Sequence, residues 1–141
     1  MDAPVDCVFC KIAAGEIPSL KVFDDATTFA FLDINPLADG HLLVIPRAHY
    51  AQLDEMPDDE VSRVTGHLPR LARAVVAATG AEGYNILQNN GAVSGQAVMH
   101  VHFHIIPRTG ADGLGYRWNA GQYPTGRDRQ MHEAIVSALQ S

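Results

Sequence analysis

The stretch HVHFHIIP at residues 100–107 alternates histidine with apolar side chains, a pattern typical of a β-strand that presents two different faces. His100, His102 and His104 then share one face, about 6.6 Å apart at a rise of ~3.3 Å per residue. The intervening apolar side chains share the other face and can pack on a core. One histidine is usually a structural group, but three in register indicate either a metal site or imidazole chemistry.

The loop before this strand favours imidazole chemistry on a phosphate. Residues 89–96 read NNGAVSGQ, a small, polar and glycine-bearing segment. Its backbone N–H groups and side-chain amides can surround an anion. Because the loop leads directly into three aligned histidines, we expect a phosphate to be held against an imidazole.

The remaining sequence predicts an α+β fold. Strands are expected at 20–23, 28–32, 41–45, 83–89 and 99–107, and helices at 7–14, 57–80 and 128–139. Pro69 lies inside the long helix and should kink or divide it. Hairpin-scale connections outnumber crossovers, which favours an antiparallel sheet.

Composition limits the classes of protein. The chain has 141 residues, a length that suits one domain, and a net charge of −6, which argues against nucleic-acid and membrane-surface partners. The acidic N-terminus lacks the features of a secretory signal, and the apolar runs are too short for a membrane span. Two cysteines are too few for a disulfide framework, and the spacing Cys7-x-x-Cys10 favours a cytoplasmic protein with a metal or redox role.

The sequence resembles the histidine triad (HIT) family of nucleotide hydrolases and transferases, and looks most like bacterial adenosine-phosphoramidate-hydrolase-like members. The triad fits the family signature, and FCKI (9–12), EIP (16–18), FLDI (31–34), GHLLVIP (40–46) and GQ (95–96) extend the match. The resemblance covers roughly 5–108 and implies one HIT domain over 1–141, with a tail at 109–141. It further implies a HIT-like five-stranded antiparallel sheet, with a long helix and a short N-terminal helix, that dimerises into a continuous sheet.

The resemblance implies hydrolysis of purine nucleoside 5′-phosphate derivatives of the phosphoramidate type, releasing a nucleoside monophosphate. His102 is implied to attack the α-phosphorus and form a covalent nucleotidyl-histidine, with its other ring nitrogen held by the His100 carbonyl. His104 would contact the phosphate or the leaving group, and His41 would support the triad. Gln96 would hydrogen-bond the leaving-group region.

Binding residues are implied in the same way. Asp33 would accept from the ribose hydroxyls, Asn89 would bind the phosphate beside Gly95, and backbone N–H groups near Ala97 and Val98 would bind developing negative charge. The apolar slot for the purine is assigned to Val8, Phe9, Ile12, Phe31, Ile34 and Leu43. Such a slot discriminates weakly between bases, so the expected substrates are AMP derivatives, with GMP derivatives also accepted.

The cysteines have two readings. By resemblance, Cys7, Cys10, His49 and His100 complete a structural zinc site, which the chemistry itself does not require. The rival reading is a redox pair that forms a reversible disulfide.

Three functional questions stay open at this point. Ala97 stands where several family members carry Ser or Thr, so the preferred leaving group is open. The chain could instead be a diadenosine polyphosphate hydrolase or a nucleotidyl transferase. A zinc-stabilised nucleotide-binding adaptor with little turnover is the alternative from another class. In the tail, Tyr116 and Trp118 are candidates to reach the active site of a dimer partner.

Overall fold

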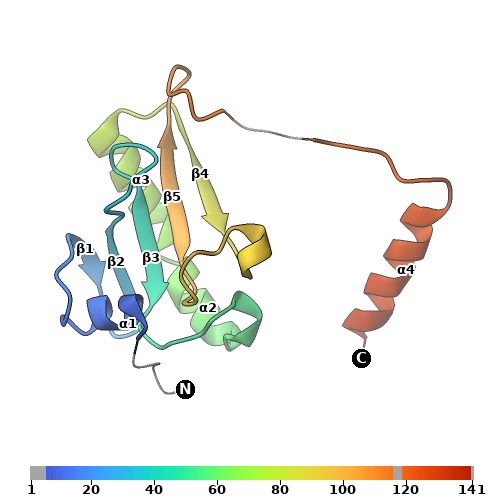
Figure 1. Cartoon of the computed structure of the whole chain (residues 1–141), viewed down its shortest axis with the longest axis horizontal. Helices are drawn as coiled ribbons and strands as arrows, with labels where there is room; N and C mark the ends of the chain where they lie inside the picture. The colour runs from blue at the N-terminus through green and yellow to red at the C-terminus, as the bar shows by residue number, and fades with distance from the viewer. Residues whose placement is uncertain (1–5, 116–118, 141) are drawn as a thin grey trace.

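The computed structural model describes residues 6–115 and 119–140, and it contains the expected five-stranded antiparallel sheet (Figure 1). Its strands are β1 (Lys21–Asp24), β2 (Thr28–Leu32), β3 (Leu42–Pro46), β4 (Gly83–Gln88) and β5 (Phe103–Arg108). They lie in the order β1-β2-β3-β5-β4. The predicted fold class is confirmed.

The helices are α1 (Val8–Ala13), α2 (Asp58–Thr65), α3 (Leu68–Thr79) and α4 (Arg127–Leu139), with short 3₁₀ turns η1 (Leu53–Glu55) and η2 (Ala92–Ser94). The long helix expected at 57–80 is divided into α2 and α3. Pro69 lies in the first turn of α3, where a missing N–H costs no helical hydrogen bond. The expected long helix is therefore divided before this proline and is not kinked.

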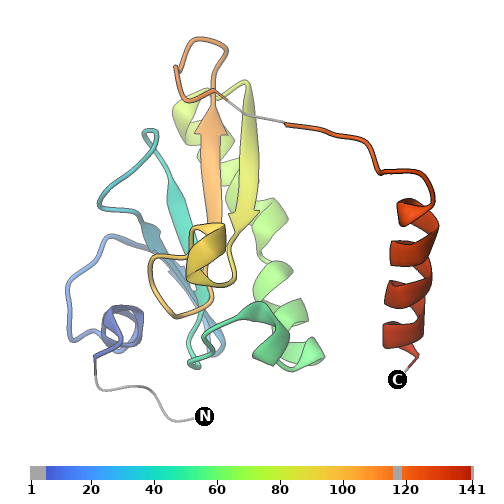
Figure 2. The same ribbon diagram turned by 45° about the vertical axis from the view of Figure 1, so that its right-hand side comes forward.

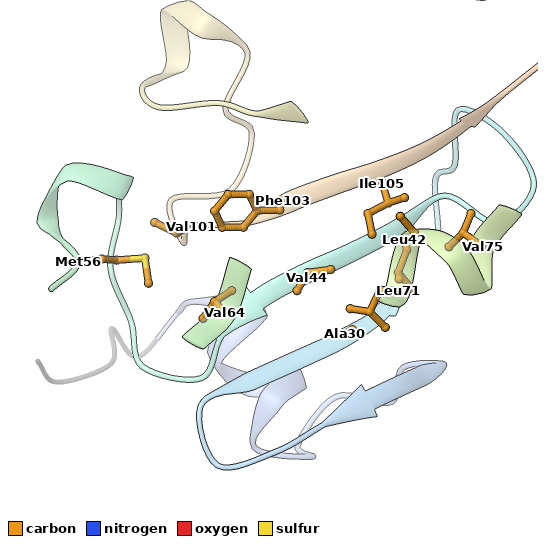
Figure 3. Packing of buried hydrophobic residues seen from close by; sticks show 11 residues of the cluster. Ala30, Leu42, Val44, Met56, Val64, Leu71, Val75, Val101, Phe103 and Ile105 are labelled. Atoms are coloured by element: carbon orange, nitrogen blue, oxygen red, sulfur yellow. The ribbon is translucent and has the colours of Figure 1, made fainter. Parts of the chain in front are cut away.

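One face of the sheet is buried under α2 and α3 (Figures 1 and 2). Alternate residues of the three central strands point to this side and meet the apolar faces of the two helices, as Figure 3 shows. The buried cluster contains Ala30, Leu42, Val44, Met56, Val64, Leu71, Ala72, Val75, Val101, Phe103 and Ile105. The apolar side of the alternating stretch therefore packs on the core as predicted.

The opposite face carries the histidines and is covered in part by α1. Register places Phe31 of β2 opposite Leu43 of β3, Leu43 opposite His104 of β5, and His104 opposite Leu87 of β4. Directly paired residues point to the same side of a sheet, so these four side chains form one cross-strand row. Phe9 packs at the start of this row, edge-on to Phe31 with ring centroids 5.5 Å apart.

The strand expected at 99–107 begins later, at Phe103. His100 and His102 lie in the segment that leads into β5, where the Val101 N–H donates to the Tyr50 carbonyl at 2.8 Å instead of to a neighbouring strand. The alternation of faces nevertheless continues through this segment, because Val101 is buried in the same cluster as Phe103.

The tail leaves the sheet after Arg108. The Arg108 guanidinium holds the first part of the tail by donating to Asp112 at 2.7 Å and to the Gly115 carbonyl at 3.2 Å. The expected terminal helix is present as α4 and stands apart from the sheet in both views (Figures 1 and 2). Tyr116 and Trp118 lie outside the described residues. Within the described ranges, every helix is too short or too polar to cross a membrane.

Gly40 should be required for the turn that presents His41. Its φ is +91°, and an added Cβ would lie 2.6 Å from the Thr79 Cγ2 methyl. We expect Gly40→Ala to lower the free energy of unfolding by about 1–3 kcal/mol in urea denaturation. Gly121→Ala is the matched control, since a Cβ there meets nothing within 4 Å. Equal losses in the two variants would contradict this assignment.

Candidate functional site

A cavity of about 420 Å³ opens on the histidine face of the sheet. This size lies within the range of ~300–1,000 Å³ that is common for small-molecule sites. Residues from α1, β2 and β3 form its apolar walls, and two triad histidines also line it. The lining residues that the sequence predicted are Val8, Phe9, Ile12, Phe31, Asp33, Ile34, Leu43, Ala97, Val98, His102 and His104.

Four further lining residues were not predicted. Ile17, Pro18 and Ser19 come from the connection between α1 and β1, and Asn35 follows Asp33 closely in the chain. The stretch at 16–18 was visible in the sequence as part of the family resemblance, but nothing local marked it as a cavity wall.

The ring of His102 is fixed by a backbone contact. Its Nδ1–H donates to the carbonyl oxygen of His100 at 2.7 Å. The neutral ring therefore carries its lone pair on Nε2. His102 is 5 % exposed, and Phe9 packs edge-on against it with centroids 5.1 Å apart. A buried, oriented imidazole with a free Nε2 has the form of a nucleophile.

His104 is oriented by a chain of hydrogen bonds that begins in the backbone. The Leu37 N–H donates to Nδ1 of His41 at 3.0 Å, which leaves the His41 proton on Nε2. That Nε2–H donates to Nδ1 of His104 at 2.8 Å. The proton of neutral His104 consequently lies on its own Nε2. Burial lowers the pKa of His41, and burial together with neighbouring His102 and His41 lowers the pKa of His104 to about 4.

Asp33 stands next to this chain. One carboxylate oxygen accepts from the Asn35 N–H at 2.8 Å, and the other lies 3.7 Å from Nε2 of His41. The donor atoms of Asp33, His41 and His104 are close enough together to hold a metal. However, Nε2 of His41 carries a proton and donates it to His104, so it has no lone pair for an ion. The side chains of Asp33, His41 and His104 are therefore arranged for hydrogen bonding and not for binding a metal.

The backbone at the start of the triad segment presents donors to the cavity. Ala97 and Val98 line it beside His102. Within the described residues, no group accepts from either of their N–H groups. Two free backbone N–H groups near His102 are of the kind that can stabilise a developing oxyanion.

Gln96 is held by the backbone of its own loop and of Ala51. Its side chain is 4 % exposed, its Oε1 accepts from the Gly91 N–H at 2.7 Å, and its Nε2 donates to the carbonyls of Ala51 at 2.7 Å and Val98 at 3.0 Å. The amide thus has partners in the backbone, and Gln96 is not among the residues that line the cavity. Its contact with the leaving-group region stays a prediction. Gln96 holds the loop that carries the free donors.

Asn89 and Gly95 also lie outside the cavity lining. Gly95 has a φ of +108°, and a Cβ added there would lie 3.5 Å from Nδ2 of Asn89. The two residues therefore pack against each other at the base of the loop.

A second cluster brings together the four predicted metal ligands. The ligand atoms of Cys7, Cys10, His49 and His100 all lie within 4.8 Å of one another. The His100 Nε2–H donates to the Pro46 carbonyl at 2.8 Å, which leaves Nδ1 unprotonated and facing the sulfurs. A backbone partner of this kind typically orients a metal-bound histidine.

The spacing of the donor atoms fits a tetrahedral ion. Typical Zn–S and Zn–N bonds place a sulfur and a nitrogen about 3.6 Å apart and two nitrogens about 3.3 Å apart. The corresponding separations are 3.4 Å for Cys7–His100, 3.4 Å for Cys10–His49, 3.5 Å for Cys10–His100 and 3.2 Å for His49–His100. Burial raises the pKa of Cys10 to about 12, so a bound cation would have to displace the thiol proton.

The fold, the histidine triad and the four-residue metal-ligand cluster together point to one class of protein. The HIT domain family matches residues 14–111, which is more than half of the chain. The chain therefore belongs to the HIT family.

Particular relatives extend the match over nearly the whole chain. It is 47 % identical to the adenosine 5′-monophosphoramidase hnt1 of Schizosaccharomyces pombe, over 96 % of this chain and 99 % of that protein. The histidine triad nucleotide-binding protein of Candida albicans superposes with a TM-score of 0.86 at 41 % identity, covering 96 % and 98 % of the two chains. A Zn-bound histidine triad family protein from Mycobacterium smegmatis superposes with a TM-score of 0.74 at 33 % identity, covering 95 % and 97 %.

Loss of the Gln96 amide should loosen the loop. Gln96→Ala leaves the Gly91 N–H and the Ala51 carbonyl without a partner and removes one of the two donors to the Val98 carbonyl, so we expect it to lower the free energy of unfolding by about 2–4 kcal/mol. Urea denaturation measures the loss, with Gln130→Ala on exposed α4 as the control. A loss no larger than that of the control would contradict the role of Gln96 in holding the loop.

Proposed function

We propose that the protein hydrolyses nucleoside 5′-phosphoramidates and releases a nucleoside monophosphate, with His102 as the nucleophile. The observation that carries this proposal is the hydrogen bond from His102 Nδ1 to the His100 carbonyl, which leaves Nε2 free on a residue that lines the cavity. The phosphoramidase relative and the nucleotide-binding relative support the substrate class.

The nucleoside occupies the apolar part of the cavity. Phe9, Phe31 and Leu43 provide walls for the base, and the Asp33 carboxylate accepts from the ribose hydroxyls. The walls offer few polar groups to read a base, so adenosine and guanosine derivatives are both accepted. The phosphate then lies between His102 and the free N–H groups of Ala97 and Val98.

In the first step, Nε2 of His102 forms a bond to phosphorus while the P–N bond breaks. The amine needs a proton as it leaves, and this proton comes from solvent. His104 keeps its own proton on Nε2, because its Nδ1 accepts from His41, and the Nε2–H donates a hydrogen bond to the phosphate.

In the second step, water attacks phosphorus and the bond to His102 breaks. The proton that the water releases passes to solvent, and His104 stays neutral throughout. The products are a free amine and a nucleoside monophosphate, and both histidines return to their starting protonation states. His41 acts through His104, because its Nε2–H fixes which nitrogen of His104 faces the phosphate.

Replacing the nucleophile should abolish turnover. We expect His102→Ala to reduce AMP release from adenosine 5′-phosphoramidate by at least about a thousandfold, because no second nucleophile replaces Nε2. AMP is quantified by chromatography, and His132→Ala on exposed α4 serves as the control.

Rapid-quench mass spectrometry should detect a wild-type adduct one nucleotidyl group heavier, absent from His102→Ala. Undiminished turnover in that variant would exclude the mechanism. Tight AMP binding without turnover or adduct would indicate a nucleotide-binding adaptor. Cleavage of diadenosine polyphosphates faster than cleavage of the phosphoramidate would indicate a diadenosine polyphosphate hydrolase.

We also infer that the four-residue cluster holds a structural zinc ion. The donor set, the tetrahedral spacing and the Zn-bound relative support it. The cluster offers four protein ligands and leaves no open position for a substrate. Zinc would therefore tie α1, which contributes Cys10, to the segment that carries His100 and His102.

Metal analysis tests this site. Protein purified without chelator should contain about one zinc per chain, and Cys10→Ser should contain much less, since soft thiolate ligands set the affinity. Zinc removal should lower the melting temperature. Arg63→Ser, on the exposed surface of α2, is the control and should retain zinc. A zinc-free protein with a reversible Cys7–Cys10 disulfide would overturn the inference in favour of the redox reading.

We further propose that the chain is one HIT domain that works as a cytoplasmic homodimer. β4 is an edge strand with unpaired backbone groups, and its Tyr84 and Ile86 side chains are 47 % and 44 % exposed. Pairing of two such edges would join the sheets. The free cysteines support a reducing compartment.

A further inference from the structure

The short helix α1 supplies one wall of the cavity that the proposed function assigns to the nucleoside, and this helix needs external anchors. Val8, Phe9 and Ile12 all line the cavity. A helix of six residues is too short to be stable alone, so contacts with the rest of the fold have to hold it. Its N-terminal end is tied to the metal-ligand cluster through Cys7 and Cys10. A different group holds its C-terminal end.

Arg47, the first residue after β3, holds the C-terminal end of α1. Its Nη1 donates to the carbonyl of Ala13, the last residue of the helix, at 2.9 Å. The carbonyls of the three preceding residues accept from backbone N–H groups of residues 14–17. Among the described residues, the Ala13 carbonyl has no backbone donor of this kind, so Arg47 satisfies it. A cation at this end of a helix also lies at the negative end of the helix dipole.

The same guanidinium is bound to the hairpin of β1 and β2. Its Nε donates to the Asp25 carbonyl at 2.7 Å, and its Nη2 pairs with the Asp24 carboxylate. The group also lies over the Phe29 ring, 5.3 Å from the ring centroid. All three nitrogens of one planar fork thus contact two separate segments of the chain, which a single ammonium group cannot do. Arg47 therefore sets the spacing between α1 and the hairpin.

The connection between α1 and β1 transmits this restraint to the cavity. Arg47 lines a second hollow, of about 290 Å³. Four residues line both this hollow and the cavity: Ile12, Ile17, Pro18 and Ser19. These four residues form a partition between the two spaces. Both cations that line the second hollow, Arg47 and Lys21, pair with the Asp24 carboxylate, so Arg47 acts there on the partition and not on an anionic ligand.

We propose that Arg47 is a positioning residue for nucleoside binding, because it keeps α1 and the partition at the spacing that the base and the ribose require. This inference rests on the proposed function. Arg47 is not among the residues that line the cavity, so it acts through α1 and the partition. The phosphate is assigned to His102 and the N–H groups of Ala97 and Val98, whereas the side-chain contacts of Arg47 lie in α1 and the hairpin. Loss of Arg47 therefore weakens binding of the nucleoside and spares the chemical step.

Steady-state kinetics with adenosine 5′-phosphoramidate and titration with AMP test the proposal in wild-type protein and Arg47→Gln. Glutamine removes the charge and the fork, but the backbone bond from the N–H of residue 47 to the Thr27 carbonyl is retained. We expect KM and the AMP dissociation constant each to rise about tenfold, with kcat changed less than about twofold, because only binding contacts are lost. A smaller fraction of folded protein would instead lower kcat and leave KM unchanged.

Arg47→Lys separates geometry from charge. Lysine keeps the charge but cannot donate to α1 and the hairpin together, so KM should stay at least about fivefold above the wild-type value. Arg70→Gln is the matched control, because Arg70 also lies over an aromatic ring, that of Phe23 at 4.6 Å, but belongs to α3 on the opposite face of the sheet. This control should keep the wild-type KM.

Asp24→Asn weakens the hairpin end of the same contact. We expect it to raise KM by about threefold, and the double variant with Arg47→Gln should be no worse than Arg47→Gln alone, because the two side chains act through one interaction. If Arg47→Gln does not fold, Arg47→Lys and Asp24→Asn provide the same test of KM against kcat.

An unchanged KM in Arg47→Gln, a fall in kcat without a rise in KM, or a wild-type KM in Arg47→Lys would overturn the proposal. The metal content of Arg47→Gln should equal that of the wild type. A loss of metal would show that the substitution acts through nearby His49, which would also refute the proposal. If the wild-type protein binds AMP but releases none from the phosphoramidate, the proposed function fails, while the AMP dissociation constants still decide the role of Arg47.

Discussion

The hydrogen bond from His100 Nε2 to the Pro46 carbonyl is the contact on which the metal-ligand cluster (Cys7, Cys10, His49 and His100) and the triad around His102 both depend. It joins the end of β3 to the segment that leads into β5. Because it takes up Nε2, it turns the Nδ1 lone pair of His100 towards Cys7 and Cys10. The carbonyl of the same residue then accepts from His102. One buried residue therefore orients the ligand cluster with its ring and the candidate nucleophile with its backbone.

The two clusters also share the short helix α1. Cys10 is one of the four metal-ligand residues. Phe9, its neighbour in the helix, contacts the rings of both His100 and His102 and lines the cavity. A helix of six residues is too short to be stable alone, so its position comes from these tertiary contacts. The wall of the cavity that Phe9 lines is consequently only as well ordered as the packing around the four metal-ligand residues. A structural ion can thus affect substrate binding without taking part in the chemistry.

Much of this arrangement could be predicted, because it follows local rules. Alternation placed Val101, Phe103 and Ile105 in the core, and the resemblance brought the four ligands together. Other features depend on partners distant in sequence. The late start of β5 follows from the Tyr50 carbonyl, and the orientation of Gln96 from backbone groups at both ends of its loop and from Ala51. The position of the first part of the tail follows from the ion pair between Arg108, at the end of β5, and Asp112, which no periodic pattern reveals.

The sheet order has a consequence for folding. β5 inserts between β3 and β4, so His104 meets His41 across a separation of 63 residues, and His100 meets Cys7 across 93. Contacts of such high sequence separation require closure of long loops and form late. During synthesis, neither cluster can assemble until β5 has been made. The hairpin of β1 and β2 can form early, but both clusters wait for residues 100–104, about three-quarters of the way along the 141-residue chain.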